Sequence, residues 1–420
     1  MKNQTLITNI KKLYTSHQSP PVKGEKMSEI FSLENAYLIF EDGIIKDIGV
    51  DFDQDMSTFD KVYDATGLIC VPGFIDSHTH LVFGGSREDE FSLKLEGVPY
   101  LDILKNGGGI LNTVQKTRDA SFEDLYKQAK KSLDEMLLYG VTTIEAKSGY
   151  GLELETELKQ LKVLKALNDS HPINIHATYL GAHALPKTFA NQRQDFIEII
   201  KKDLEVVHAE GLAEYVDVFC ETGVFTAKET KEILEKAKSL GFKLRVHTDE
   251  IDSIGGTEVS LKLGAKTVDH LMALKEEDME ELAKSDTIGN LLPATSFFLN
   301  KEYAPARKMI EKGMALSISS DYNPGSTPSE NYQLALQLAA NKLRMKPNEI
   351  LTASTINPAY SLDIHHQYGA LKPGYVADIL LLDAKNWDYV MYHYGINHTA
   401  HVFKKGVLVV KDRHLIKELI

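Results

Sequence analysis

The sequence predicts an α/β fold: a parallel (β/α)₈ TIM barrel with a small composite β-sandwich domain built from the N- and C-terminal flanks. Three observations predict it. Strand-like and helix-like segments alternate through the middle of the chain, eight strand-like segments can be counted, and both flanks carry hairpin-like patterns instead. Eight strands that alternate with helices favour a closed parallel barrel over an open sheet. The expected domain limits are 1–72 and 361–420 for the two parts of the sandwich and 73–360 for the barrel.

The eight strand-like segments are short apolar runs, rich in β-branched residues and bounded by turn residues. The first, GLICVPGFIDSHTH, precedes the regular alternation, which starts near residue 121. In chain order the segments cover 67–80, 141–147, 173–180, 215–221, 243–250, 265–271, 287–295 and 314–321.

The stretch at 121–140 shows why the intervening segments are expected to be helices. Ser121 and Asp124 have the spacing of a capping box, apolar residues recur every three or four positions, and Gly140 ends the run. Further helical stretches are expected at 153–168, 193–211, 227–241 and 275–285.

The two flanks have strand and turn patterns of a different kind. Alternating residues at 36–49 surround Asp42-Gly43, which is typical of a two-residue hairpin turn, and Lys405-Gly406 marks a similar turn within 401–416. A further strand-like stretch lies at 370–384. We expect both flanks to pair into one module beside the barrel.

Composition excludes several classes of protein. The chain has 420 residues and a net charge of −13, without a concentrated basic stripe, so nucleic acid is not an expected partner. The N-terminus lacks the apolar core of a secretory signal, and no apolar run approaches the ~20 residues of a membrane span. We therefore expect a cytoplasmic protein without a membrane partner. Cys70 and Cys220 are expected to be buried free thiols.

Metal-ligating residue types stand at the carboxyl ends of the predicted strands, where the active sites of such barrels lie. His78 and His80 end the first strand on the same side, because side chains alternate along a strand. His247, His270 and Asp321 end the fifth, sixth and eighth. Imidazoles and a carboxylate can form a metal site with an open position for water. One metal is expected, because the fourth strand offers no lysine as a bridging ligand for a second.

A metal ion at these strand ends would activate water for hydrolysis. Asp321 would bind the metal and take the proton of the water, while His270 and Glu250 would polarise the scissile bond and carry a proton to the leaving nitrogen. A solvated loop charge is the alternative for Glu250. Thr295 is expected at the end of the seventh strand. Lys147, at the end of the second, is expected to be structural or to contact the substrate.

Longer motifs resemble the amidohydrolase superfamily and, within it, the imidazolonepropionases. The resemblance covers most of the chain and implies a cyclic-amide hydrolase of histidine degradation. It would cleave the ring C–N bond of a small anionic substrate, 4-imidazolone-5-propanoate, to give N-formimidoyl-L-glutamate, and a homodimer is expected. The motifs are PGFIDSHTH, HTHLVFGGSREDEF, GGGI at 107–110, TTIEAKSGYGLELETELK, TYLGAHALP, RVHTDEI, LSISSDYNPGS and TASTINPAYSLDIHHQYGALKPGYVADILLLD.

The resemblance also implies which residues form the site. The metal ligands would be His78, His80, His247 and Asp321, and they would hold one divalent or trivalent ion per subunit, zinc or iron. Contacts with the substrate or the ring-opened product would come from Arg87, Tyr150, His183, Glu250, Asn323, Gly325 and Ser326. The run Gly107–Gly109 is expected to approach the site closely.

Arg87 has two interpretations. Its guanidinium can bind a propionate carboxylate with two parallel hydrogen bonds, or it can form an ordinary surface pair with Glu88 or Asp89. A second alternative concerns the activity: a related deaminase would act on an aminated ring, but a neutral base offers Arg87 no partner. A third is a non-catalytic barrel that keeps its ligands for metal-dependent folding.

Overall fold

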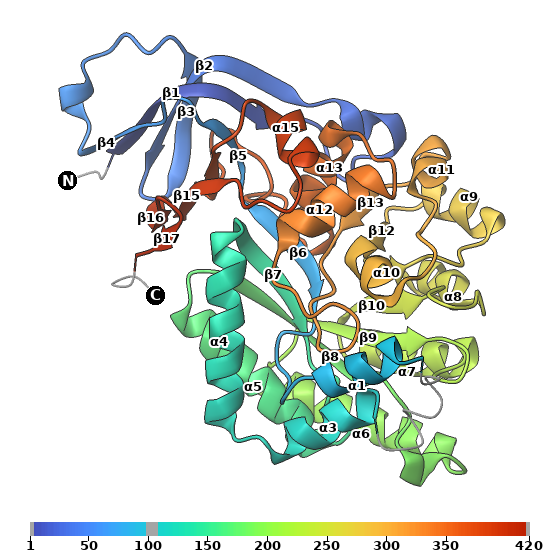
Figure 1. Cartoon of the computed structure of the whole chain (residues 1–420). Coiled ribbons are helices and arrows are strands. Elements are labelled where there is room, and N and C mark those ends of the chain that lie inside the picture. Colours follow the sequence, from blue (N-terminus) through green and yellow to red (C-terminus); the bar gives the residue numbers. More distant parts are fainter. Residues whose placement is uncertain (1–3, 98–107, 417–420) are drawn as a thin grey trace.

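The computed structural model describes residues 4–97 and 108–416. Its centre is a sheet of eight parallel strands whose order follows the chain, from β6 to β13 (Figure 1). Nearly every strand residue is buried, as expected for a sheet enclosed by helices. The strands are β6 (Phe74–Thr79), β7 (Val141–Lys147), β8 (Asn174–Ala182), β9 (Tyr215–Cys220), β10 (Lys243–Thr248), β11 (Thr267–His270), β12 (Ile288–Leu291) and β13 (Leu316–Ile318).

The sheet closes where the residues after β13 meet the end of β6. The Asp321 amide donates to the His78 carbonyl at 3.1 Å, and the His80 amide donates to the Tyr322 carbonyl at 2.8 Å. The predicted barrel is therefore confirmed, and its closure places Asp321 beside the two histidines of the first strand.

Helices surround the barrel, and the five helical stretches expected from the sequence are confirmed as α4, α5, α6, α7 and α9. The Ser121 hydroxyl accepts from the Asp124 amide at the start of α4, as its spacing predicts. The helices are α1 (Glu88–Leu95), α3 (Ile110–Asp119), α4 (Phe122–Leu138), α5 (Leu154–Ser170), α6 (Arg193–Glu210), α7 (Ala227–Ser239), α8 (Gly256–Leu263), α9 (Glu276–Lys284), α10 (Pro293–Leu299), α11 (Ala306–Glu311), α12 (Tyr332–Asn341), α13 (Pro347–Ser354), α14 (Ile356–Ser361) and α15 (Trp387–Tyr392).

The seventh strand is shorter than the sequence predicts. β12 ends at Leu291, Pro293 begins α10, and Thr295 therefore lies on a helix. Proline is well suited to the first turn of a helix, because its fixed φ is helical and its missing N–H would have no partner there. The continuous apolar run conceals this change from strand to helix. Thr295 still reaches the site, since its hydroxyl donates to Asp321 Oδ2 at 2.6 Å.

The flanks form one mixed sheet of nine strands beside the barrel, drawn blue and red in Figure 1. The two flanks join where β5 pairs antiparallel with β14, which confirms the composite module; its predicted limits stay a prediction. The strands are β1 (Gln4–Thr15), β2 (Phe31–Glu41), β3 (Ile44–Val50), β4 (Lys61–Asp64), β5 (Ile69–Pro72), β14 (Ile379–Leu382), β15 (Thr399–Lys404), β16 (Val407–Lys411) and β17 (His414–Leu415).

Both predicted hairpin turns are present in the module. Asp42 and Gly43 have φ angles of 50° and 77°, and Lys405 and Gly406 have 49° and 76°. Positive φ at both central residues is the mark of a type I′ turn, whose twist matches that of the strands.

Gly73 alone separates β5 of the module from β6 of the barrel. A Cβ atom at this position would lie 2.3 Å from Thr142 Oγ1, so only glycine fits the junction without a shift. Elsewhere, Cys70 and Cys220 are buried and free, as expected. Among the helices of residues 4–97 and 108–416, none is long and apolar enough to cross a membrane.

Candidate metal centre and active site

Four side chains from three strand ends converge on one point at the carboxyl end of the barrel. His78 Nε2 and His80 Nε2 each lie 3.5 Å from Asp321 Oδ1, and His80 Nε2 lies 3.4 Å from His247 Nε2. Ligand atoms that each lie about 2.0–2.1 Å from a tetrahedral ion are separated by about 3.4 Å. Each of these three spacings therefore fits a pair of ligands on one ion of that size. The groups whose ligand atoms all lie within 4.8 Å of one another are His78, His80 and Asp321, and separately His78, His247 and His270.

The hydrogen-bonding pattern also fits a metal ion. His78 Nε2 is buried and has no hydrogen-bond partner in the described part of the chain. A buried polar atom without a partner is costly unless a ligand or water satisfies it. Imidazole nitrogens and a carboxylate oxygen suit zinc and other transition metals, so the donor set can hold such an ion.

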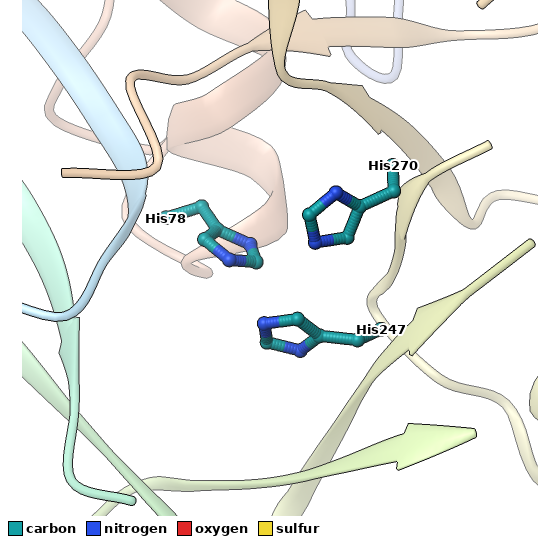
Figure 2. Close-up of side chains that lie close together, drawn as sticks. All are labelled: His78, His247 and His270. Carbon is teal, nitrogen blue, oxygen red and sulfur yellow. The ribbon is translucent and has the colours of Figure 1, made fainter. Parts of the chain in front are cut away.

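His270 borders this cluster on the side of Glu250. Figure 2 shows the rings of His78, His247 and His270 turned toward one another, and one nitrogen of each could share an ion. His270 Nε2 lies 3.7 Å from Glu250 Oε2. His270 and Asp321 have φ angles of 84° and 56°, in the left-handed region that Asp and His adopt more readily than most residues.

Two buried aspartates orient the histidines from behind. Asp217 on β9 lies 3.0 Å from His247 Nδ1, and Asp269 on β11 lies 3.4 Å from His78 Nδ1. A carboxylate behind a metal-binding imidazole fixes the ring and its tautomer, and it raises the basicity of the ligand. Neither aspartate was predicted from the sequence, although each is a charge inside a buried apolar strand and therefore needs a partner.

Lys147 is the partner of Asp217. Its ammonium lies 2.8 Å from both Asp217 and Glu145, and all three side chains are fully buried. Burial would lower the pKa of Lys147, but the two carboxylates outweigh it and raise that pKa. The structural alternative for Lys147 is therefore the one that the geometry supports.

The environment also sets the protonation of the cluster. Burial lowers the pKa of His78 and His80 well below the ordinary value, and Lys147 and the other histidines lower it further. Burial would lower the pKa of His247 too, but the charge of Asp217 raises it. Burial raises the pKa of Asp321. Metal binding requires the deprotonated forms, so protons and metal compete for these atoms.

Arg87 pairs with a residue other than the expected surface partners. Its Nε and Nη2 atoms donate to Glu90 at 3.0 and 2.8 Å, and both side chains are largely buried. The surface pair with Glu88 or Asp89 is therefore not the arrangement found. Of the Gly107–Gly109 run, Gly107 lies outside the described residues, while the Gly109 amide donates to Glu90 at 2.9 Å.

Tyr150 and His183 lie next to His80. The His183 ring stacks on that of His80 with centroids 4.9 Å apart, and the Tyr150 ring is 5.8 Å from it. Burial lowers the pKa of His183 to about 3, so the ring is neutral at ordinary pH. Its Nδ1 donates to the Gly149 carbonyl at 3.0 Å, which leaves Nε2 as a hydrogen-bond acceptor.

Two further carboxylates hold the loops that carry Tyr150 and Glu250. Glu157 accepts hydrogen bonds from the amides on either side of Tyr150, and Glu221 accepts them from the amide of Glu250 and from the two that follow. Both are almost fully buried. The donors are the amides of Gly149, Gly151, Leu152, Glu250, Ile251 and Asp252, at 2.8–3.1 Å.

The loop after β13 folds around Asn323. The side-chain oxygen of Asn323 accepts from the amides of Gly325 and Ser326 at 2.8 Å, and its nitrogen donates to the Asp321 carbonyl at 2.7 Å. Ser326 Oγ lies 3.3 Å from Asp321 Oδ2. These residues lie beside the cluster, and the Asn323 side chain is used to shape its own loop.

The chain is similar in sequence to known proteins. The sequence profile of the Amidohydrolase family matches residues 69–409. The imidazolonepropionase of Streptococcus sanguinis is 49% identical over 401 residues, which cover 94% of this chain and 95% of that protein. That of Streptococcus gordonii is 48% identical over 422 residues, covering 99% and 100%.

A solved structure supports the fold at much lower identity. An adenosine deaminase from Xanthomonas campestris with bound zinc superposes with a TM-score of 0.71 at 15% identity, over 98% of this chain and 94% of that one. Identity this low speaks for the fold alone. The family profile matches most of the chain, and the two streptococcal proteins are nearly half identical to it. The chain therefore belongs to the amidohydrolase family and, within it, to the imidazolonepropionases.

Proposed function

We propose that the protein hydrolyses the ring C–N amide bond of 4-imidazolone-5-propanoate to N-formimidoyl-L-glutamate, a step of histidine degradation. The observation that carries the proposal is that donor atoms of His78, His80, His247 and Asp321 lie 3.4–3.5 Å from one another in three pairs, in a chain nearly half identical to imidazolonepropionases along its whole length. A hydrolase of a cyclic amide needs an activated water and an acid for the leaving nitrogen, and the site offers candidates for both.

The cofactor in this proposal is one divalent or trivalent ion, zinc or iron, held by the four converging side chains. The adenosine deaminase with the same fold contains zinc, which supports that choice of metal. Such an ion supplies Lewis-acid chemistry: it lowers the pKa of water and polarises a carbonyl oxygen.

The residues around the ligands move the protons. Asp321 takes the proton of the attacking water; its Oδ2 is held by Thr295, which leaves Oδ1 facing the histidines. His270 stabilises the negative charge that develops on the ring carbonyl oxygen. Glu250, which lies 3.7 Å from His270 and is only partly exposed, carries a proton to the leaving nitrogen.

The substrate is held by Arg87, Tyr150, His183 and the loop after β13. Arg87 binds the propionate carboxylate, and the neutral His183 accepts a hydrogen bond from a ring N–H through Nε2. Tyr150 covers the ring, and Asn323, Gly325 and Ser326 line the space of the ring-opened product. A homodimer and a cytoplasmic location are further expectations of the family resemblance, and sedimentation velocity tests the first.

The test follows the absorbance of freshly generated 4-imidazolone-5-propanoate with purified protein. We expect rapid decay with the metal-loaded protein, loss of decay after chelation and recovery on reloading. Arg87→Ala should lose most of the activity, while Arg413→Ala, which removes an exposed guanidinium of the module, should keep it. A metal-loaded protein that leaves the substrate unchanged would contradict the proposal, and aminated rings would then be tested for deamination.

A further inference from the structure

Among the described residues, the guanidinium of Arg87 is hydrogen-bonded along one edge only. Nε and Nη2 both donate to a single oxygen, Oε2 of Glu90, at 3.0 and 2.8 Å. A guanidinium has five N–H groups, and Glu90 uses two of them. Two N–H groups on Nη1 and one on Nη2 remain, and this Nη1–Nη2 edge has the geometry that binds a carboxylate with two parallel hydrogen bonds.

Glu90 is itself fixed by the other oxygen of its carboxylate. Oε1 accepts from the Gly109 amide at 2.9 Å and from Asn112 Nδ2 at 3.2 Å, so this carboxylate ties α1 to the start of α3. Burial would raise the pKa of Glu90, but the hydrogen bonds and the charge of Arg87 outweigh it and lower that pKa. Glu90 is therefore ionised at neutral pH.

Gly325, in the loop that follows the neighbouring strand β13, limits the position of the same guanidinium. A Cβ atom on Gly325 would lie 2.2 Å from Arg87 Nη1, so any side chain there would push the guanidinium aside. The Gly325 backbone cannot easily yield, because its amide donates to Asn323 at 2.8 Å. The loop after the eighth strand thus leaves a space that Arg87 fills.

We propose that Glu90 and Gly325 are positioning residues that make the site selective for a carboxylate, by holding Arg87 with its Nη1–Nη2 edge free for the propionate of the substrate. The proposal rests on the proposed function; it adds Glu90 to the site and gives Gly325 a second role. A free arginine side chain samples many rotamers, and fixing it beforehand reduces the entropy lost when the substrate binds.

The first experiment compares Glu90→Gln with Glu88→Gln. Both remove one negative charge from α1, but Glu88 is exposed and bonds only to the nearby Ser86 among the described residues. The probes are the KM for 4-imidazolone-5-propanoate and the inhibition constants of imidazole-4-propanoate and of its neutral amide. We expect Glu90→Gln to raise the KM and the inhibition constant of the carboxylate about tenfold to a hundredfold. The constant of the amide should change by less than about twofold, and Glu88→Gln should change none of the three.

A general structural role of Glu90 would give a different result. If carboxylate and amide lose affinity equally in Glu90→Gln, the selectivity proposal is wrong. A double-mutant cycle sharpens this test: in the Arg87→Ala background, Glu90→Gln should have no further effect on the KM, because its target is gone. A full additional loss in that background also contradicts the proposal.

Gly325→Ala provides a second variant that does not depend on the folding of Glu90→Gln. The added methyl displaces the guanidinium, and the same preferential loss of carboxylate affinity is expected; equal losses for carboxylate and amide contradict the proposal here too.

The outcomes separate the two proposals. A wild-type protein without turnover of the imidazolone overturns the proposed function and this inference together. Turnover by the wild type with an unchanged KM in Glu90→Gln overturns only the inference.

Discussion

The histidine cluster and the loops above it are held in two different ways. The cluster, His78, His80, His247, His270 and Asp321, is supported from behind by side chains of neighbouring strands, in a fully buried chain of ion pairs. The loops with Arg87, Tyr150 and Glu250 are held by carboxylates that accept hydrogen bonds, mostly from backbone amides.

This difference shows which parts of the structure fix the positions of the site residues. Metal ligands have to lie within a few tenths of an ångström of their places, and adjacent strands supply such rigidity. Substrate-binding side chains lie on loops, which need a separate support for each segment. In this protein that support is a buried glutamate for each loop: Glu90, Glu157 and Glu221.

The largest effect is expected from breaking the cluster itself. Asp321→Asn removes a proposed metal ligand that is also the proposed proton acceptor, so kcat should fall about 10²–10⁴-fold. Metal content measured on the same sample shows whether the metal is lost as well. Asp412→Asn, an exposed substitution in the module, serves as the control. Activity within a few-fold of wild type would contradict the role of Asp321.

The next largest effect concerns the ion pairs behind the cluster. Lys147→Met leaves two buried carboxylates without their cation, and the free energy of unfolding should fall by about 3–5 kcal/mol. The midpoint of urea unfolding of the metal-free protein measures the change. Lys127→Met removes an exposed lysine with one surface partner and should cost less than about 1 kcal/mol. An equal loss of unfolding free energy in both variants would contradict the expectation that the buried ion pairs stabilise the protein more than the surface pair does.

A smaller effect is expected for residues that orient a metal-binding histidine but do not themselves bind the metal. Asp217→Asn keeps the shape of the side chain but removes the charge 3.0 Å from His247 Nδ1, so metal affinity should fall about 10–100-fold. Competition with a chromophoric chelator measures it. Asp269→Asn should act in the same direction but more weakly, since Asp269 is 3.4 Å from His78. Unchanged affinity in both variants would show that the strands alone set the ring positions.

The smallest effect concerns the pH dependence of stability that arises from Asp203, a carboxyl influenced by the charge of the loop support Glu157. Burial, together with the charge of Glu157, raises the pKa of Asp203 on α6 to about 6. A carboxyl whose pKa is higher in the folded state loses stability as it ionises, so the unfolding free energy should fall as pH rises from about 4 to about 6. Asp203→Asn removes this loss and should be more stable than wild type by about 1–3 kcal/mol at pH 7. At pH 4 the two should be nearly equal. Urea unfolding at both pH values checks the sign.

The cluster was predictable from the sequence because its residues stand directly at strand ends. A histidine or aspartate that interrupts an apolar run at that point has few ordinary explanations, and the closure of the barrel does the rest. Asp217 and Asp269 left a similar signal as charges within buried strands, which pairing arguments could have used.

The loop supports were not predictable in the same way. Glu90 lies 19 residues from Gly109, and Glu221 lies 29 residues from Glu250, so no local pattern connects these pairs. Glu157 lies only 5–8 residues from the amides that it holds, but nothing in the sequence shows that its side chain turns back to them. Each glutamate looks like a solvated charge until the chain is folded. The predicted position of Thr295 at a strand end was wrong for a different reason: an apolar run can end a strand and begin a helix without any polar break.

The junction at Gly73 has a consequence for the order in which the chain can fold during synthesis. β5 and β6 are nearly one strand. β5 can pair with β1 as soon as it is made, yet its second partner β14 follows only after about 300 further residues. All the barrel strands, with the candidate metal ligands, leave the ribosome before that second partner exists. The module therefore closes last, and its completion secures the start of the strand that carries His78.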